Sequence, residues 1–136
     1  MFELHPKLAS GSFAVADLTL SELRLINDRR FVWLILVPKR EGLTELHRLS
    51  ESEQQQLLSE SSRVSQVIEA CLPVDKLNVG ALGNVVPQFH WHIVGRRRDD
   101  PCWPGPVWGC GEAQPYPRGQ QQQLIAMLRD GLKERV

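Results

Sequence analysis

The chain has 136 residues, of which 42% are hydrophobic, and its 16 basic and 16 acidic side chains give a formal net charge of zero. This length favours one domain over residues 1–136, with a core large enough to be stable without disulfides or bound metal ions. A neutral chain gives no indication of binding to nucleic acid or to a membrane surface. Residues 1–6 lack the basic and apolar regions of a signal peptide, and no apolar run is long enough to span a bilayer.

The cysteines are few and show no dense pattern. Cys71, Cys102 and Cys110 make an odd number. Such usage favours a reducing cytoplasm over a secreted, disulfide-bonded scaffold. The spacing of Cys102 and Cys110 is not that of the usual close pair of metal ligands. We therefore expect three unpaired thiols in a cytoplasmic protein.

The first part of the chain alternates between apolar and polar residues in a way that favours strands. After an irregular lead-in over residues 1–11, we expect strands at residues 12–18 and 22–26, which can pair as a hairpin. The continuous apolar run of residues 31–37, which Pro38 stops, predicts a central strand that is buried on both faces.

A long helix is expected after this strand. Ser50 and Glu53 make a capping-box pattern at its start, apolar residues then recur at helical spacing, and Pro73 ends it. Two further strands are expected at residues 76–83 and 88–94. The first of them is loosened by glycines, which often mark a close approach of the backbone to a ligand.

The remainder of the chain combines an irregular segment with a last helix. We expect the arginines of residues 96–98 to lie in a solvated turn. The segment 101–117, which is rich in proline, glycine and tryptophan, is expected to be an ordered loop. Apolar spacing predicts a helix over residues 120–134. These elements predict an α+β fold with a mostly antiparallel sheet, one long helix after the third strand and a C-terminal helix.

The strand expected at residues 88–94 carries the chemistry. Alternation in a strand places Gln88, His90 and His92 on one face, with the two imidazoles roughly 6.5–7 Å apart. Two imidazoles at this separation can reach one small anion or one metal ion. Three interpretations are open, and we rank phosphate chemistry first, a structural role second and a metal site third.

In phosphate chemistry, His90 attacks phosphorus and forms a covalent phospho-histidine that water hydrolyses. His92 donates to the phosphate oxygens, Gln88 adds a neutral hydrogen bond, and residues 80–84 supply backbone N–H groups. A metal site needs a third ligand, which nothing in the sequence identifies, and the following arginines would repel a cation. A histidine on an apolar strand is more often structural, but two on one face, between glycine and arginine, weaken that interpretation.

The region 78–94 resembles the signature of the histidine triad (HIT) family, in which histidines alternate with apolar residues. The run 34–40 is also similar to the family's strand that ends in Pro-Lys, and the order of elements matches over about residues 12–98. The resemblance implies an α+β fold with an antiparallel sheet, a homodimer, and binding of nucleoside phosphates. It also implies hydrolysis or transfer through a nucleotidyl-histidine intermediate. We expect no cofactor and no metal.

The resemblance also assigns roles to individual positions. His90 matches the nucleophile, and His92 matches the histidine that contacts the transferring phosphate. Asn27 resembles a position that binds the ribose hydroxyls in the family. Asn78 falls near the position of a polar residue that contacts the nucleotide, but the spacing is one residue shorter than in the family. The positions expected to contact the nucleotide are Asn27, Asn78, Gly83 and Asn84.

Three positions depart from the family's pattern. Gln88 replaces the first histidine, Val85 stands where serine or threonine is common, and Trp33 stands where many members have a further phosphate-side histidine. The family's nucleophile is oriented mainly by backbone, so we expect the change at Gln88 to be tolerated, and for Trp33 we favour core packing. The leading hypothesis is a nucleotide phosphohydrolase or nucleotidyl transferase with His90, His92 and Gln88 in the catalytic site. The alternative is a nucleotide-binding module with little or no turnover.

Overall fold

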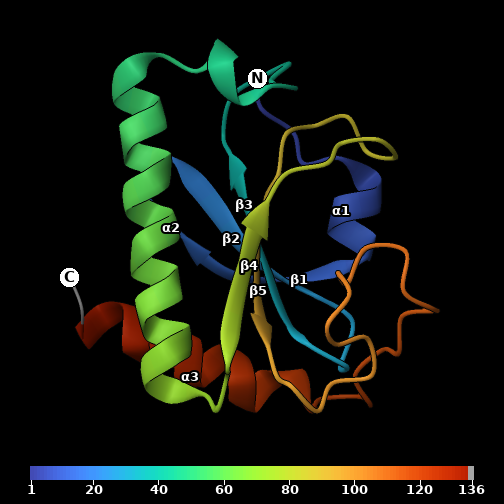
Figure 1. Cartoon of the computed structure of the whole chain (residues 1–136). Helices are drawn as coiled ribbons and strands as arrows, with labels where there is room; N and C mark the ends of the chain where they lie inside the picture. The colour runs from blue at the N-terminus through green and yellow to red at the C-terminus, as the bar shows by residue number, and fades with distance from the viewer. Residues whose placement is uncertain (135–136) are drawn as a thin grey trace.

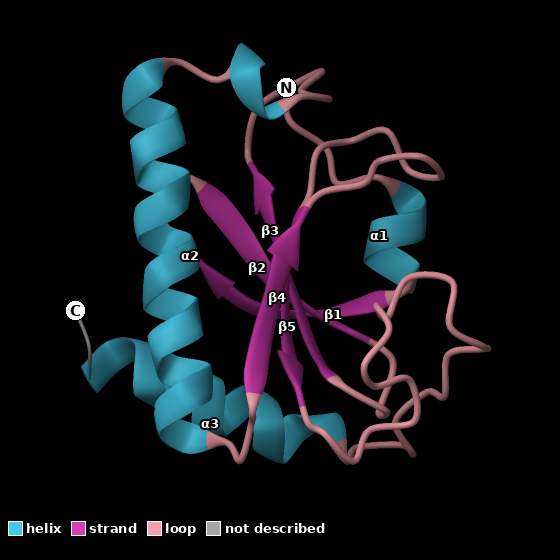
Figure 2. Ribbon diagram, viewed as in Figure 1, coloured by secondary structure: helices cyan, strands magenta, loops and turns pink. Residues whose placement is uncertain are grey.

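The structure, a computed structural model, describes residues 1–134. Its elements are α1 (Pro6–Ser10), β1 (Ser12–Asp17), β2 (Ser21–Ile26), β3 (Val32–Pro38), the 3-10 helix η1 (Leu46–Arg48), α2 (Glu51–Cys71), β4 (Lys76–Gly80), β5 (Trp91–Arg96) and α3 (Gln121–Glu134). Among the described residues, five strands form one antiparallel sheet in the order β1-β2-β3-β5-β4. The predicted α+β fold is confirmed, including the long helix after the third strand and the C-terminal helix (Figures 1 and 2).

The main core lies between the sheet and the two longer helices. In Figure 1, α2 runs alongside the sheet and α3 passes beneath one end of it. Leu25 on β2, Leu34 on β3 and Ile93 on β5 belong to one buried cluster with Leu57 and Ile68 of α2, and each of these side chains is fully buried. β3 is therefore the central strand that its apolar run predicts, and its packing fixes the position of β5 beside it.

The ends and the packing of the long helix follow from particular residues. The Ser50 hydroxyl accepts a hydrogen bond from the Glu53 N–H at 3.2 Å, and the Glu53 carboxylate accepts one from the Ser50 N–H at 3.0 Å, which confirms the capping box. The helix ends two residues before Pro73. α3 approaches it closely at Gly131, where a Cβ atom would lie 2.6 Å from a Val67 methyl carbon.

None of the helices within residues 1–134 has the length and apolar character needed to cross a bilayer.

The boundaries of β4 and β5 differ from the prediction. β4 ends at Gly80 and β5 begins at Trp91, so that residues 81–90 form a loop between them. Pro87 has no N–H to give to a ladder, and the Phe89 N–H donates to a main-chain oxygen outside the sheet. Strand alternation therefore does not place Gln88 or His90, which precede the strand.

The N-terminal lead-in is also more regular than predicted, because residues 6–10 form the short helix α1. Pro6 occupies the first turn, where its missing N–H has no helical partner to lose. The His5 side chain caps the helix, since its Nδ1 accepts a hydrogen bond from the Lys7 N–H at 3.1 Å. This segment passes close to the loop before β5, and it contacts Gln88 there.

Candidate active site

His90 lies in the loop that enters β5, and only 8% of its surface is exposed. Its Nδ1 lies 2.7 Å from the main-chain oxygen of Gln88. A carbonyl oxygen only accepts hydrogen bonds, so this contact assigns a proton to Nδ1 and leaves the lone pair of the neutral ring on Nε2. A main-chain oxygen thus orients the His90 ring and leaves the lone pair of the neutral ring on Nε2.

His92 is the second residue of β5, and its side chain is 5% exposed on the sheet face away from α2. Its ring centroid lies 4.7 Å from that of His90. The indole N–H of Trp33 donates to His92 Nδ1 at 2.9 Å. An indole nitrogen is only a donor, so Nδ1 holds a lone pair and the proton of the neutral ring is on Nε2. Burial, reinforced by the neighbouring His90, lowers the pKa of His92 from 6.5 to about 3.

The two imidazoles therefore carry their ring protons on opposite nitrogens. His90 has a free lone pair on Nε2, whereas His92 has an N–H on Nε2. One nucleophile beside one hydrogen-bond donor suits attack on a phosphoryl group. A metal ion requires converging lone pairs, and no group of three His, Cys, Asp or Glu within residues 1–134 is arranged to hold one.

A cavity of about 240 Å³ opens beside His90. Its walls come from residues 44–46, from residues 81–83 of the loop before β5, and from residues 89–91. Gly83 lies in this wall with a φ of +76°, a backbone conformation that residues other than glycine rarely adopt. The structure thus brings His90 together with the predicted glycine-bearing stretch.

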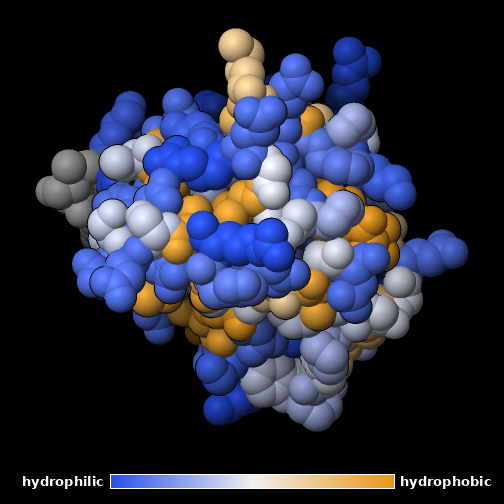
Figure 3. All heavy atoms as spheres, turned by 90° about the horizontal axis from the view of Figure 1, so that it is seen from above, coloured by the Kyte–Doolittle hydropathy of each residue, from blue (hydrophilic) through white to orange (hydrophobic). Residues whose placement is uncertain are grey.

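The loop that borders this cavity is partly apolar at its surface. Leu82 is 51% exposed and Val85 is 78% exposed. Figure 3 looks onto this end of the molecule, where hydrophobic atoms lie at the surface among hydrophilic ones. A larger cavity, of about 320 Å³, lies at the other end of β5 beside Gly95, and none of the predicted site residues lines it. Of the two cavities, it is the smaller one that the predicted residues His90 and Gly83 line.

The side chain of Gln88 faces the N-terminal segment. Its Oε1 accepts a hydrogen bond from the His5 N–H at 2.8 Å, and its Nε2 donates to the main-chain oxygen of Glu3 at 2.8 Å. Neither amide atom bonds to His90, which Gln88 contacts through its main-chain oxygen. Asn84, in the same loop, is exposed.

The two other predicted asparagines have partners within the protein. Asn27 follows β2, and its Oδ1 accepts a hydrogen bond from the Tyr116 N–H at 2.8 Å. Asn78 lies on β4 opposite Val94, and its Oδ1 accepts a hydrogen bond from Arg96 Nη1 at 2.9 Å. Neither lines the cavity beside His90.

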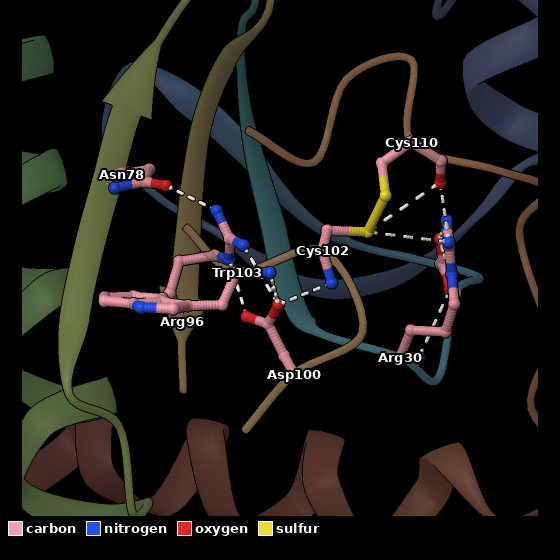
Figure 4. Close-up of a disulfide and its surroundings, with 8 residues drawn as sticks. Arg30, Asn78, Arg96, Asp100, Cys102, Trp103 and Cys110 are labelled. Atoms are coloured by element: carbon pink, nitrogen blue, oxygen red, sulfur yellow. Dashed lines mark hydrogen bonds and ion pairs between the residues drawn. A yellow bond between two sulfur atoms is a disulfide. The ribbon is translucent and has the colours of Figure 1, made fainter. Parts of the chain in front are cut away.

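Arg96 is buried, with 1% exposure, so the prediction of a solvated turn at this residue is wrong. β5 continues to Arg96, and alternation turns its side chain onto the face that the following loop covers. There its guanidinium makes hydrogen bonds of 2.8 and 3.0 Å to Asp100 (Figure 4). It also lies over the rings of Phe31 and Trp103. Burial alone would raise the pKa of Asp100, but the bonds from Arg96 and from backbone N–H groups lower it below its ordinary value.

The segment 101–117 is the ordered loop that its tryptophans predict, and it packs on the sheet face that carries His92. Val107 is 2% exposed in a cluster with Phe31 and Val94. The ring of Trp108 lies 5.2 Å from that of His92, measured between centroids. The loop thus forms part of the wall behind the histidines.

A disulfide joins Cys102 to Cys110 across this loop, with 6.2 Å between the Cα atoms (Figure 4). The prediction of three unpaired thiols is therefore wrong, and Cys71 is the free cysteine of residues 1–134. The loop folds back on itself within eight residues. The Arg30 guanidinium donates a hydrogen bond to the Cys110 main-chain oxygen at 2.7 Å, which stabilises the returning part of the loop. Spacing alone does not reveal such a fold-back.

Trp33 is the residue near the histidines whose contact the sequence did not identify. The apolar run favours core packing for Trp33, and its ring does pack against Phe31 and Trp108, but its N–H also donates to His92. A signal was available, because the N–H of a tryptophan inside a buried apolar run needs an acceptor. In the observed register Ile35 of β3 pairs with His92, which places Trp33 on the same face.

Solved structures resemble this chain over most or all of its length. A histidine triad protein from Marinobacter aquaeolei VT8 has a TM-score of 0.95 and 41% sequence identity, and the match covers 100% of this chain and 99% of that one. A histidine triad protein from Sinorhizobium meliloti 1021 has a TM-score of 0.93 and 39% identity, with 96% of each chain covered. A hypothetical histidine triad nucleotide-binding protein from Sulfolobus tokodaii strain7 shares the fold at 15% identity, with a TM-score of 0.67 over 90% of this chain and 85% of that one.

The sequence profile of the HIT domain matches residues 9–99, which is more than half of the chain. No curated protein matches the chain. The profile covers α2, all five strands of the described sheet, and both histidines of the candidate site. The chain therefore belongs to the histidine triad (HIT) family.

Proposed function

We propose that this protein binds nucleoside phosphates and hydrolyses or transfers them at phosphorus, with His90 as the nucleophile. The observation that supports this most is the opposite protonation of the two adjacent imidazoles. His90 Nε2 attacks phosphorus with its lone pair and forms a P–N bond, while the bond to the leaving group breaks and its electron pair departs with that group. Water then attacks the nucleotidyl-histidine, which releases the nucleoside monophosphate and restores the imidazole.

Other groups of the site are proposed to bear the charge of the reaction. When His90 is bonded to phosphorus its ring is positive, and the Gln88 main-chain oxygen at Nδ1 stabilises that charge. His92 donates its Nε2–H to a phosphoryl oxygen. Gly83 and Asn84 lie in the loop beside the cavity and are proposed to offer backbone N–H groups to the same oxygens.

The nucleotide contacts proposed for Asn27 and Asn78 carry a requirement. Each amide oxygen already accepts a hydrogen bond within the protein. The amide N–H groups are the atoms left for a ligand, so we propose that these residues donate to ribose or phosphate oxygens. A protein that shares the fold at 15% identity is described as nucleotide-binding, which supports nucleotides as the ligand class.

The test is turnover of adenosine phosphoramidate by the wild-type protein and by His90→Asn. We expect His90→Asn to lose at least about a thousandfold in kcat, because it removes the nucleophile. Mass spectrometry of rapidly quenched wild-type enzyme should show an adenylyl adduct on His90. Equal turnover by the two proteins would refute His90 as nucleophile.

The second candidate function is a nucleotide-binding module without turnover. It is favoured by Gln88, whose amide is engaged by the N-terminal segment, and by Val85, which offers no polar group near a leaving group. Calorimetry with AMP and GMP beside the turnover assay separates the two functions. Binding without turnover selects the module, and absence of binding defeats both.

We also propose a homodimer and a cytoplasmic location. β4 is an edge strand, and Val79 on it is 44% exposed, which suits pairing with a second copy. Sedimentation that gives the mass of one chain would refute the dimer. The Cys102–Cys110 disulfide is the observation against a cytoplasmic location, since cytosolic thiols are usually reduced. Cell fractionation decides the compartment.

A further inference from the structure

Within residues 1–134, Trp33 is the one side chain that makes a hydrogen bond to the ring of His92. Its indole N–H lies 2.9 Å from His92 Nδ1. The indole itself is held by edge-to-face contacts with Phe31, at 6.2 Å between centroids, and with Trp108, at 6.4 Å. The donor is therefore fixed in place before any ligand binds.

We propose that Trp33 is a positioning residue that holds His92 neutral, with its proton on Nε2 and that N–H available to the phosphate. This inference rests on the proposed function, because it assigns Trp33 a part in the same reaction. The position is one at which many family members have a histidine, and for a tryptophan there the sequence favours core packing.

The argument follows from what each nitrogen can do. If His92 carried a proton on Nδ1, as an imidazolium or as the other tautomer, two N–H groups would face each other across 2.9 Å. If the ring flipped about its Cβ–Cγ bond, a carbon would replace Nδ1 and the indole N–H would lose its acceptor inside a buried site. A buried donor without an acceptor is costly, so one tautomer and one ring orientation are selected together.

The arrangement separates the roles of two similar side chains. A carbonyl oxygen opposite His90 Nδ1 and an indole N–H opposite His92 Nδ1 produce opposite protonation of rings whose centroids are 4.7 Å apart. Without Trp33, Nδ1 of His92 could bind a proton, and the ring could compete as base or nucleophile. With Trp33, His92 can only donate from Nε2.

The first test is the titration of His92, followed by the chemical shifts of its ring nitrogens in wild-type protein, Trp33→Phe and Trp108→Phe. Wild-type protein should show a hydrogen-bonded, unprotonated Nδ1 and a protonated Nε2 for His92, and the reverse for His90. In Trp33→Phe, we expect His92 to titrate higher by about one pH unit or more, because Nδ1 no longer faces an N–H. His90, the titratable neighbour of His92, is the same in all three proteins.

Trp108→Phe is the matched control. It alters a second indole that touches the His92 ring but makes no hydrogen bond to it within the described residues. Because phenylalanine keeps an aromatic ring beside His92 and the Trp33 N–H is retained, the His92 titration should stay closer to wild type than in Trp33→Phe. A wild-type His92 with its proton on Nδ1 would overturn the proposal even if Trp33→Phe does not fold, and so would equal titration of His92 in wild type and a folded Trp33→Phe.

The second test is the kinetics of adenosine phosphoramidate hydrolysis. Trp33→Phe should lower kcat by about three- to tenfold, the order of one hydrogen bond, and leave KM within about twofold. Equal kcat in Trp33→Phe and wild type would overturn the positioning role. Absence of turnover by the wild-type protein refutes the proposed function alone, and the nitrogen shifts then still decide whether Trp33 fixes the protonation of His92.

Discussion

Replacing His92 with asparagine should remove a large part of the acid sensitivity of the fold. The pKa of His92 is about 3 in the folded protein, where burial and His90 lower it, and near 6.5 once the chain unfolds. Below pH 6.5 the unfolded chain therefore binds a proton at this side chain that the folded protein does not. The free energy of unfolding then falls by about 1.4 kcal/mol per pH unit. Between pH 7 and pH 5 this amounts to about 2 kcal/mol.

The assay is urea unfolding of wild-type protein and His92→Asn at pH 7, 6 and 5. Asparagine keeps an acceptor for the Trp33 N–H but does not titrate. The carboxylates and the histidines other than His90 contribute equally to both proteins, so the difference between the two curves reports on His92 together with its interaction with His90. Wild-type stability should fall by about 2 kcal/mol more than that of the variant. Parallel curves would refute the burial and hydrogen bonding that we assign to His92.

Two further predictions concern the loop behind the site. Asp100→Asn should lower the free energy of unfolding by about 3 kcal/mol, because it leaves the buried Arg96 guanidinium without its counter-charge. Urea unfolding near pH 7 measures this loss, and a loss below about 1 kcal/mol would contradict a stabilising role for the Arg96–Asp100 ion pair. The double variant Cys102→Ser, Cys110→Ser should lose about 2–3 kcal/mol through the entropy of the opened loop, and equal stability of variant and non-reduced wild type would show that the bridge contributes nothing.

The order of elements could be predicted because local patterns set it. The capping box at Ser50 and Glu53, the apolar run that becomes β3, and the helical spacing of α3 each depend on residues close in sequence. The same holds for the location of the site, since His90 and His92 are two residues apart. The predicted strand boundaries around residues 81–90 were wrong for the opposite reason. A hydrogen bond from the Phe89 N–H to a main-chain oxygen forty-six residues earlier in the chain helps to set where β5 begins.

The contacts of the buried polar groups could not be predicted from the sequence, because they depend on how distant segments meet. Arg96 follows a strand and precedes two aspartates, which is the pattern of a solvated turn. Its burial depends on Asp100, on the ring of Phe31, which directly precedes β3, and on a loop that folds over Arg96, Asp100 and Phe31. Cys102 and Cys110 are paired by the same fold-back.

The three departures from the family's pattern have different physical consequences, although from the sequence each reads as a lost polar group. At Gln88 the side chain is not what orients His90, the proposed nucleophile, since the main-chain oxygen of that residue does so. At Val85 the loss stands, because an exposed valine offers nothing to a leaving group. At Trp33 a donor is gained, and it meets His92 at the nitrogen that must stay unprotonated for the other to donate. A leaving group would therefore receive least help from this site, whereas attack at phosphorus retains both of its imidazoles.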